Sequence, residues 1–97
     1  MNKIVNVAIQ VLPVSNTNNP YNIVDRAIEL IKDSGLNYKV CPFETVIEGK
    51  LEEILLLISK IQEVCYSAGA ETMMTYIKIQ SSAKNDVFIE DKMKKYN

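Results

Sequence analysis

Residues 42–49 of the chain read PFETVIEG, a β-forming run that carries two carboxylates and leads straight into the longest apolar segment. Successive side chains of a strand point to opposite faces of the sheet. Two sets of alternating positions result, one for each face: Glu44, Val46 and Glu48, and Phe43, Thr45 and Ile47. Two unpaired carboxylates would destabilise a fully buried strand. The run therefore predicts a polar patch on an otherwise apolar sheet.

Length and charge limit the classes of protein to consider. A chain of 97 residues is expected to form one domain, spanning residues 1–97, with a small core of its own. The 11 Lys and Arg residues are balanced by 12 Asp and Glu residues, so a phosphate-binding surface for nucleic acid is not expected. The sequence has no secretion signal and no run of 18 apolar residues, which predicts a cytoplasmic protein without a membrane partner.

The residue types for several common chemistries are missing from the sequence. Histidine is absent, so the chain cannot supply a Ser/His or Cys/His nucleophile, and no Gly-rich phosphate loop is present. Cys41 and Cys65 have no metal-like spacing and are expected to act as small buried hydrophobes. We therefore predict no catalytic residues, no metal site and no cofactor.

The periodicity of apolar residues predicts seven elements in a βαββαβ order with an added terminal helix. Strands are expected at 3–13, 36–41, 42–49 and 70–81, and helices at 21–34, 50–68 and 87–96. This order is typical of the ferredoxin-like split βαβ unit. We predict an α+β fold in which one antiparallel sheet carries both long helices on one face, with a short C-terminal helix.

The alternation of side chains predicts which residues face the helices. The apolar positions that should lie under the helices are Val5, Val7, Ile9, Val11, Ile47, Ile77 and Ile79. The opposite, open face should carry Asn6, Ala8, Gln10, Leu12, Glu44, Val46, Glu48, Thr72, Met74, Tyr76 and Lys78. A mixed apolar and polar face of this kind is typical of a surface that pairs with another copy of the chain.

The helix at 50–68 is more apolar than one sheet requires. Its predicted buried row contains Leu51, Ile54, Leu55, Ile58, Ile61, Cys65 and Ala68, and Leu56, Leu57 and Val64 lie outside that row. Either the helix is deeply packed or it contacts another subunit.

Two interpretations of the carboxylates remain open from the residues. Glu44 and Glu48 could form ordinary surface ion pairs with Lys78 or Lys39. Alternatively, a carboxylate beside Gln10, Thr45, Tyr76 and apolar side chains could hold a flat, cationic or amidine-like ligand through charge-assisted hydrogen bonds. Acid and base catalysis by the two glutamates is a weaker hypothesis because no nucleophile or cofactor motif accompanies them.

Several segments resemble the small thiamine-binding proteins of the YkoF-like, ferredoxin-like group. The resemblance covers nearly the whole chain and is carried by VAIQVLP at 7–13, YNIVDRAIELIK at 21–32, SGLNY at 34–38, TVIEG at 45–49 with LEEI at 51–54, YIKI at 76–79, and IEDK at 89–92 with Lys95 and Tyr96. The Thr-x-x-Glu-Gly run at Thr45, Glu48 and Gly49 is the most recognisable part.

The resemblance implies a non-enzymatic protein that binds thiamine or its hydroxymethylpyrimidine precursor at or near a subunit interface. It implies a homodimer or homotetramer formed through the open sheet face. The expected ligand-binding residues are Gln10, Tyr38, Glu44, Thr45, Glu48 and Tyr76. In that set the glutamates hold the aminopyrimidine or the thiazolium charge, Gln10 and Thr45 add hydrogen bonds, and a tyrosine offers a stacking face. A structural or interaction module without any small-molecule ligand is the alternative.

Overall fold

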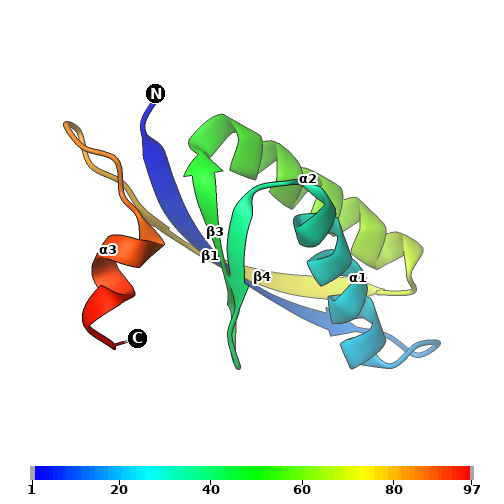
Figure 1. The fold of residues 1–97 in the computed structure, drawn as a ribbon. Coiled ribbons are helices and arrows are strands. Elements are labelled where there is room, and N and C mark those ends of the chain that lie inside the picture. Colours follow the sequence, from blue (N-terminus) through cyan, green and yellow to red (C-terminus); the bar gives the residue numbers. More distant parts are fainter. Residues whose placement is uncertain (1, 97) are drawn as a thin grey trace.

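The computed structural model describes residues 2–96 (Figure 1). The strands are β1 (Ile4–Val14), β2 (Asn37–Val40), β3 (Thr45–Lys50) and β4 (Thr72–Gln80). The helices are α1 (Pro20–Asp33), α2 (Leu51–Ser67) and α3 (Ile89–Met93), and a 3-10 turn follows at Lys94–Tyr96. Within this range no helix is both long and apolar enough to cross a membrane.

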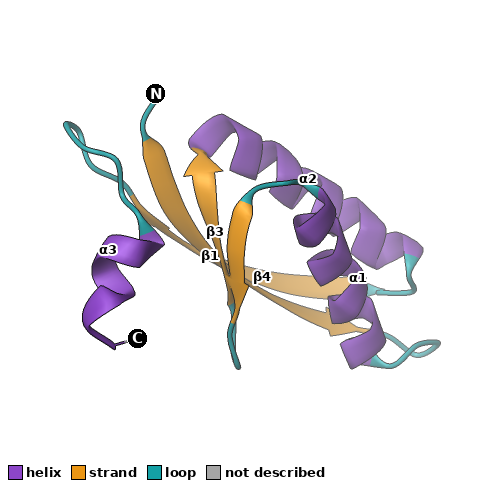
Figure 2. Ribbon diagram, viewed as in Figure 1, coloured by secondary structure: helices purple, strands orange, loops and turns teal. Residues whose placement is uncertain are grey.

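One sheet of antiparallel strands organises the chain, in the order β2-β3-β1-β4. The helices α1 and α2 lie on one face of the sheet, and α3 lies on the other side (Figure 2). The predicted α+β, ferredoxin-like arrangement, with both long helices on one face and a short C-terminal helix, is confirmed.

The pairing of the central strand β1 fixes which side chains face the helices. Val7 lies opposite Ile47 on β3 and opposite Ile79 on β4, whereas Asn6 lies opposite Glu48. The odd-numbered positions of these strands therefore form the helix side. The buried core combines that side with the inner rows of α1 and α2: Val5, Val7, Ile9, Ile23, Ala27, Ile31, Ile47, Ile54, Leu57, Ile58, Ile61, Cys65 and Ala70.

Local signals position helix α1 over the sheet. The Asn19 side chain accepts a hydrogen bond from the Tyr21 backbone N–H, and Pro20 occupies the first turn, where its missing N–H costs nothing. Gly35, with φ of 78°, follows the last turn in the left-handed region that glycine adopts without strain. The helix thus begins and ends where the sequence predicts, to within a residue.

The core prediction is wrong at the edge strand and along α2. Ile77 and Ile79 are on the helix side by register, yet they remain 41% and 48% exposed. Helix α2 packs on β1 and β3 and leaves this part of β4 uncovered. On α2 itself, Leu55 is exposed and Leu57 is buried, the reverse of the predicted row.

Two predicted boundaries also change. Strand β3 begins at Thr45, not at residue 42, because the Cys41 N–H donates to the Glu44 carbonyl at 3.0 Å and closes a turn over residues 41–44. The last helix is shorter than 87–96 and lies on the predicted open face. The Ile89 N–H donates there to Glu48 at 2.6 Å, so this face is partly covered.

The helix side of the sheet contains both buried and exposed isoleucines, and truncating one of each kind should change stability by different amounts. Ile47 is fully buried and Ile77 is 41% exposed. We expect Ile47→Ala to lower the free energy of unfolding by roughly 2–5 kcal/mol, through lost burial and a cavity. Ile77→Ala should lower it by less than about 1 kcal/mol. Urea denaturation of both variants tests this, and equal losses would contradict the packing described.

Candidate ligand-binding site

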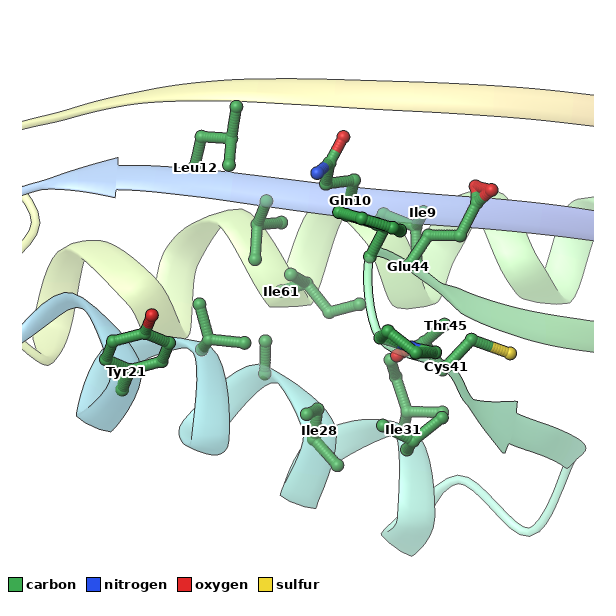
Figure 3. Close-up of a pocket in the computed structure, with 16 residues that line it drawn as sticks. Ile9, Gln10, Leu12, Tyr21, Ile28, Ile31, Cys41, Glu44, Thr45 and Ile61 are labelled. Atoms are coloured by element: carbon green, nitrogen blue, oxygen red, sulfur yellow. The ribbon is translucent and has the colours of Figure 1, made fainter.

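A cavity of about 220 Å³ opens between α1, β1 and the turn at residues 41–44 (Figure 3). Its lining comes from β1 (Ile9, Gln10, Val11, Leu12), α1 (Tyr21, Val24, Ala27, Ile28, Ile31), α2 (Ile61) and the segment from β2 to β3 (Val40, Cys41, Pro42, Phe43, Glu44, Thr45).

The cavity is apolar below and polar along its upper rim. Ile28 and Ile31 from α1 form one wall with Ile61 from α2 (Figure 3). The side chains of Gln10 and Glu44 point away from that wall, toward the sheet face that α1 and α2 do not cover (Figure 3). A ligand in this cavity would place an apolar or flat part against the isoleucines and its charged part at the rim.

Thr45 is the most enclosed polar residue of the cavity. Its side chain is on the helix side of β3, opposite Ile9, and the residue is 6% exposed. No atom of residues 2–96 forms a hydrogen bond with its hydroxyl, and the Gln10 amide likewise has no partner in that range. Among residues 2–96 the fully buried side-chain polar atom without a hydrogen-bond partner is Asn6 Oδ1, so the unpaired Thr45 hydroxyl is not itself fully buried. It opens to the cavity and is available to a bound molecule.

Glu44 forms an ion pair across the sheet. Its Oε1 atom is 2.8 Å from the Nζ atom of Lys78, which projects from β4 on the open face. The lysine is mostly exposed and the carboxylate is partly shielded. The interpretation of Glu44 as a partner of Lys78 is therefore confirmed, and the same carboxylate also lines the cavity.

The Glu48 carboxylate is engaged in hydrogen bonds within the chain. It accepts hydrogen bonds from the Asn37 amide at 2.9 Å, the Ile89 backbone N–H at 2.6 Å and the Asn6 amide at 3.4 Å. It lies on the face opposite Thr45, three positions along the same strand. The predicted pairing with a lysine is wrong for Glu48, which ties β1, β2 and the start of α3 together.

The two predicted tyrosines lie away from the cavity. Tyr38 is on β2 opposite Ile47 and packs against the core on the helix side. Tyr76 is on β4 opposite Gln10, half-exposed on the open face, with its hydroxyl 4.0 Å from the sulfur of Met74. Of the six predicted site residues, the structure brings Gln10, Glu44 and Thr45 together around the cavity.

Sequence reasoning missed two aromatic residues at the cavity. Phe43 projects from the turn at 41–44 and Tyr21 from the first turn of α1, and both are strongly exposed. An exposed Phe beside a proline, between two strands, is the signal that could have indicated a binding loop.

The two cysteines differ in environment. Cys41 is partly exposed at the cavity, whereas Cys65 is buried under α1, where burial raises the pKa of its thiol. Cys65 therefore behaves as the predicted small buried hydrophobe, whereas that prediction is wrong for Cys41, which is only partly buried. Among residues 2–96 no three His, Cys, Asp or Glu side chains are grouped so that they could hold a metal ion.

Comparisons with known proteins agree on one family. The sequence profile described as "Thiamine-binding protein" matches residues 7–97. A UPF0045 protein of Clostridium perfringens is 36% identical over 91 residues, which cover 94% of this chain and 95% of that protein.

Two solved structures extend the similarity to three dimensions. One is a DUF77 domain from Bacillus cereus, with 37% identity, a TM-score of 0.94, and coverage of 98% of this chain and 91% of that one. The other is a Thermotoga maritima protein assigned provisionally to thiamine biosynthesis or salvage, with 31% identity, a TM-score of 0.88, and coverage of 97% and 99%. The chain belongs to the thiamine-binding protein family.

Removing the Glu48 carboxylate should affect stability. Glu48→Ala leaves the part-buried Ile89 N–H without its acceptor, and a part-buried donor without a partner costs about 1–3 kcal/mol. The Asn37 amide is exposed and the Asn6 amide keeps its bond to the Val87 carbonyl, so the loss of their bonds to Glu48 should add little. Glu44→Ala is the matched control, because an exposed ion pair contributes about 0–1 kcal/mol. Thermal denaturation of both variants would measure the difference. A Glu48→Ala protein as stable as wild type would contradict the structural role of Glu48.

Proposed function

We propose that this protein binds thiamine or its hydroxymethylpyrimidine precursor in the cavity between α1, β1 and residues 41–44, without catalysing a reaction. Two findings support the ligand class: membership of the thiamine-binding family, and similarity to a protein assigned provisionally to thiamine biosynthesis or salvage. The lining of the cavity supports the proposed location of the ligand.

The observation that carries the proposal is the unpaired hydroxyl of Thr45 in an apolar enclosure. An aminopyrimidine ring is flat, largely apolar on its faces, and polar at its nitrogen edge. Its faces would contact the isoleucines of the cavity, such as Ile28 and Ile31, while its edge would meet the Thr45 hydroxyl. Few convergent polar groups in an apolar pocket are typical of sites that orient small ligands.

The cavity size favours enclosing one ring. Its volume of about 220 Å³ is below the ~300–1,000 Å³ of pockets that enclose drug-sized ligands. The pyrimidine would therefore be enclosed and the thiazolium of thiamine would extend to the rim. There Glu44 supplies negative charge, and the exposed ring of Phe43 would attract a cation by about 0.5–2 kcal/mol.

The open sheet face supports assembly close to this cavity. Leu12, Val14, Met74 and Tyr76 expose apolar surface on β1 and β4, at the end of the face where α3 does not lie. A second copy packed on this patch, as a homodimer or within a homotetramer, would lie next to Gln10 and Glu44. The ligand would then be bound at or near a subunit interface.

The alternative function is an interaction module that takes no small molecule. The Glu44–Lys78 ion pair and the exposed apolar patch support it, because both suit a protein surface. Native mass spectrometry of the purified protein distinguishes the two functions. A co-purified mass equal to thiamine or its pyrimidine precursor supports binding, and ligand-free oligomers that stay unchanged in millimolar thiamine support the module.

Calorimetric titration with thiamine and with hydroxymethylpyrimidine tests the cavity directly. Thr45→Val keeps the shape of the side chain and removes the hydroxyl. We expect it to weaken binding about 2- to 10-fold, in line with ~0.5–1.5 kcal/mol for one hydrogen bond. Thr72→Val is the matched control, because Thr72 is exposed on β4 and does not line the cavity. Absence of heat at millimolar ligand, or equal affinity of wild type and Thr45→Val, would refute the proposal.

A further inference from the structure

The charge at the rim of the cavity is set by two residues, and only one of them lines the cavity. Glu44 is part of the lining, and no other Asp, Glu, Lys or Arg of residues 2–96 is. Lys78 does not line the cavity, yet its Nζ atom is 2.8 Å from the Glu44 Oε1 atom. A ligand can therefore contact the carboxylate without contacting the lysine that neutralises it.

The sheet register brings Lys78 to Glu44 across the open face. Lys78 on β4 lies opposite Ala8 on β1, and Ala8 lies opposite Val46 on β3. The Ala8 side chain is a single methyl group, so the long lysine side chain can pass over β1 toward Glu44. Lys39 on β2 lies at the other end of the same row, opposite Val46. Within residues 2–96 Lys39 forms no ion pair.

The ion pair is weak, and its two members differ in exposure. The Lys78 side chain is 75% exposed and that of Glu44 is 27% exposed. Water solvates a lysine ammonium that leaves such a pair, so an exposed pair contributes little. The carboxylate is less accessible to water, and its attraction to a cation is stronger than it would be in bulk water. Another cation at the rim can therefore replace the lysine at small cost.

We propose that Lys78 sets the preference of the cavity between a cationic and a neutral ligand, by competing with the ligand's positive charge for the Glu44 carboxylate. This inference rests on the proposed function. Thiamine has a permanent positive charge on its thiazolium ring, whereas hydroxymethylpyrimidine is neutral. With the pyrimidine enclosed beside Thr45, the thiazolium meets a carboxylate that Lys78 already occupies. Lys78 is thus a positioning residue, which acts on the ligand through Glu44.

The competition affects one ligand and not the other. Thiamine must displace the Lys78 ammonium to use the full charge of Glu44, so its affinity is lower than an unpaired carboxylate would give. Hydroxymethylpyrimidine brings no charge to the rim, so its affinity does not depend on the pair. The ion pair therefore narrows the difference in affinity between the two ligands.

Calorimetric titration of Lys78→Met with thiamine and with hydroxymethylpyrimidine tests this preference. We expect the variant to bind thiamine about 2- to 5-fold more tightly than wild type, the range for one exposed ion pair, and to bind hydroxymethylpyrimidine unchanged. Lys39→Met is the matched control, because it removes a positive charge from the same row and leaves the ion pair intact. Lys78→Arg keeps the charge and should bind both ligands like wild type.

Two outcomes of this titration would overturn the inference. One is a Lys78→Met protein whose thiamine affinity is not raised, and the other is an equal rise for both ligands. If wild type binds neither ligand, the binding function itself is refuted, and this inference with it. A wild type that binds both ligands with affinities that Lys78→Met leaves unchanged refutes the inference alone.

Salt dependence and a double substitution separate the role of charge from a change in structure. The thiamine affinity of Lys78→Met should fall between roughly 0.02 and 0.5 M salt, because salt screens the unpaired carboxylate, and that of wild type should fall less. In a Glu44→Gln background, Lys78→Met should no longer change thiamine affinity, because the two residues act as one unit. Equal salt dependence, or a full effect of Lys78→Met without Glu44, would overturn the inference.

Discussion

The antiparallel register between β1 and β3 is the constraint on which the rest of this structure depends. With Val7 opposite Ile47 and Asn6 opposite Glu48, each strand sends alternate side chains to opposite faces. A shift of one residue would place the valines of β1 in solvent and Glu48 under the helices. The same register puts Thr45 inside, facing the cavity, and leaves Glu48 to hold the C-terminal segment outside.

Much of the fold could be predicted from local patterns. Alternation identified the buried positions of β1 and β3, and Asn19, Pro20 and Gly35 marked the ends of α1. These signals lie within a few residues of the elements they define. The core at Val5, Val7 and Ile47 follows because those positions are apolar on the face that both long helices cover.

The rest depended on contacts between residues distant in sequence. The prediction grouped Thr45 with Glu48 in one site, but three residues along a strand place two side chains on opposite faces. Nothing near Glu48 indicates that the N–H of Ile89, 41 residues later, would use its carboxylate. Likewise, Ile77 is exposed because α2 packs over β1 and β3, and the sequence of β4 does not indicate where α2 will lie. The cavity is lined by residues of α1, β1 and the turn at 41–44, and half of the predicted site residues do not line it: Tyr38, Glu48 and Tyr76.

We propose that the ligand is bound on the helix side, beside Thr45, and not on the opposite face beside Glu48. Backbone amide NMR during titration with thiamine tests it most directly. We expect concentration-dependent shifts at Tyr21, Cys41 and Thr45, which line the cavity, with little change at Asn37 and Ile89. Shifts centred on Asn37, Glu48 and Ile89, with Tyr21 and Cys41 unaffected, would contradict it.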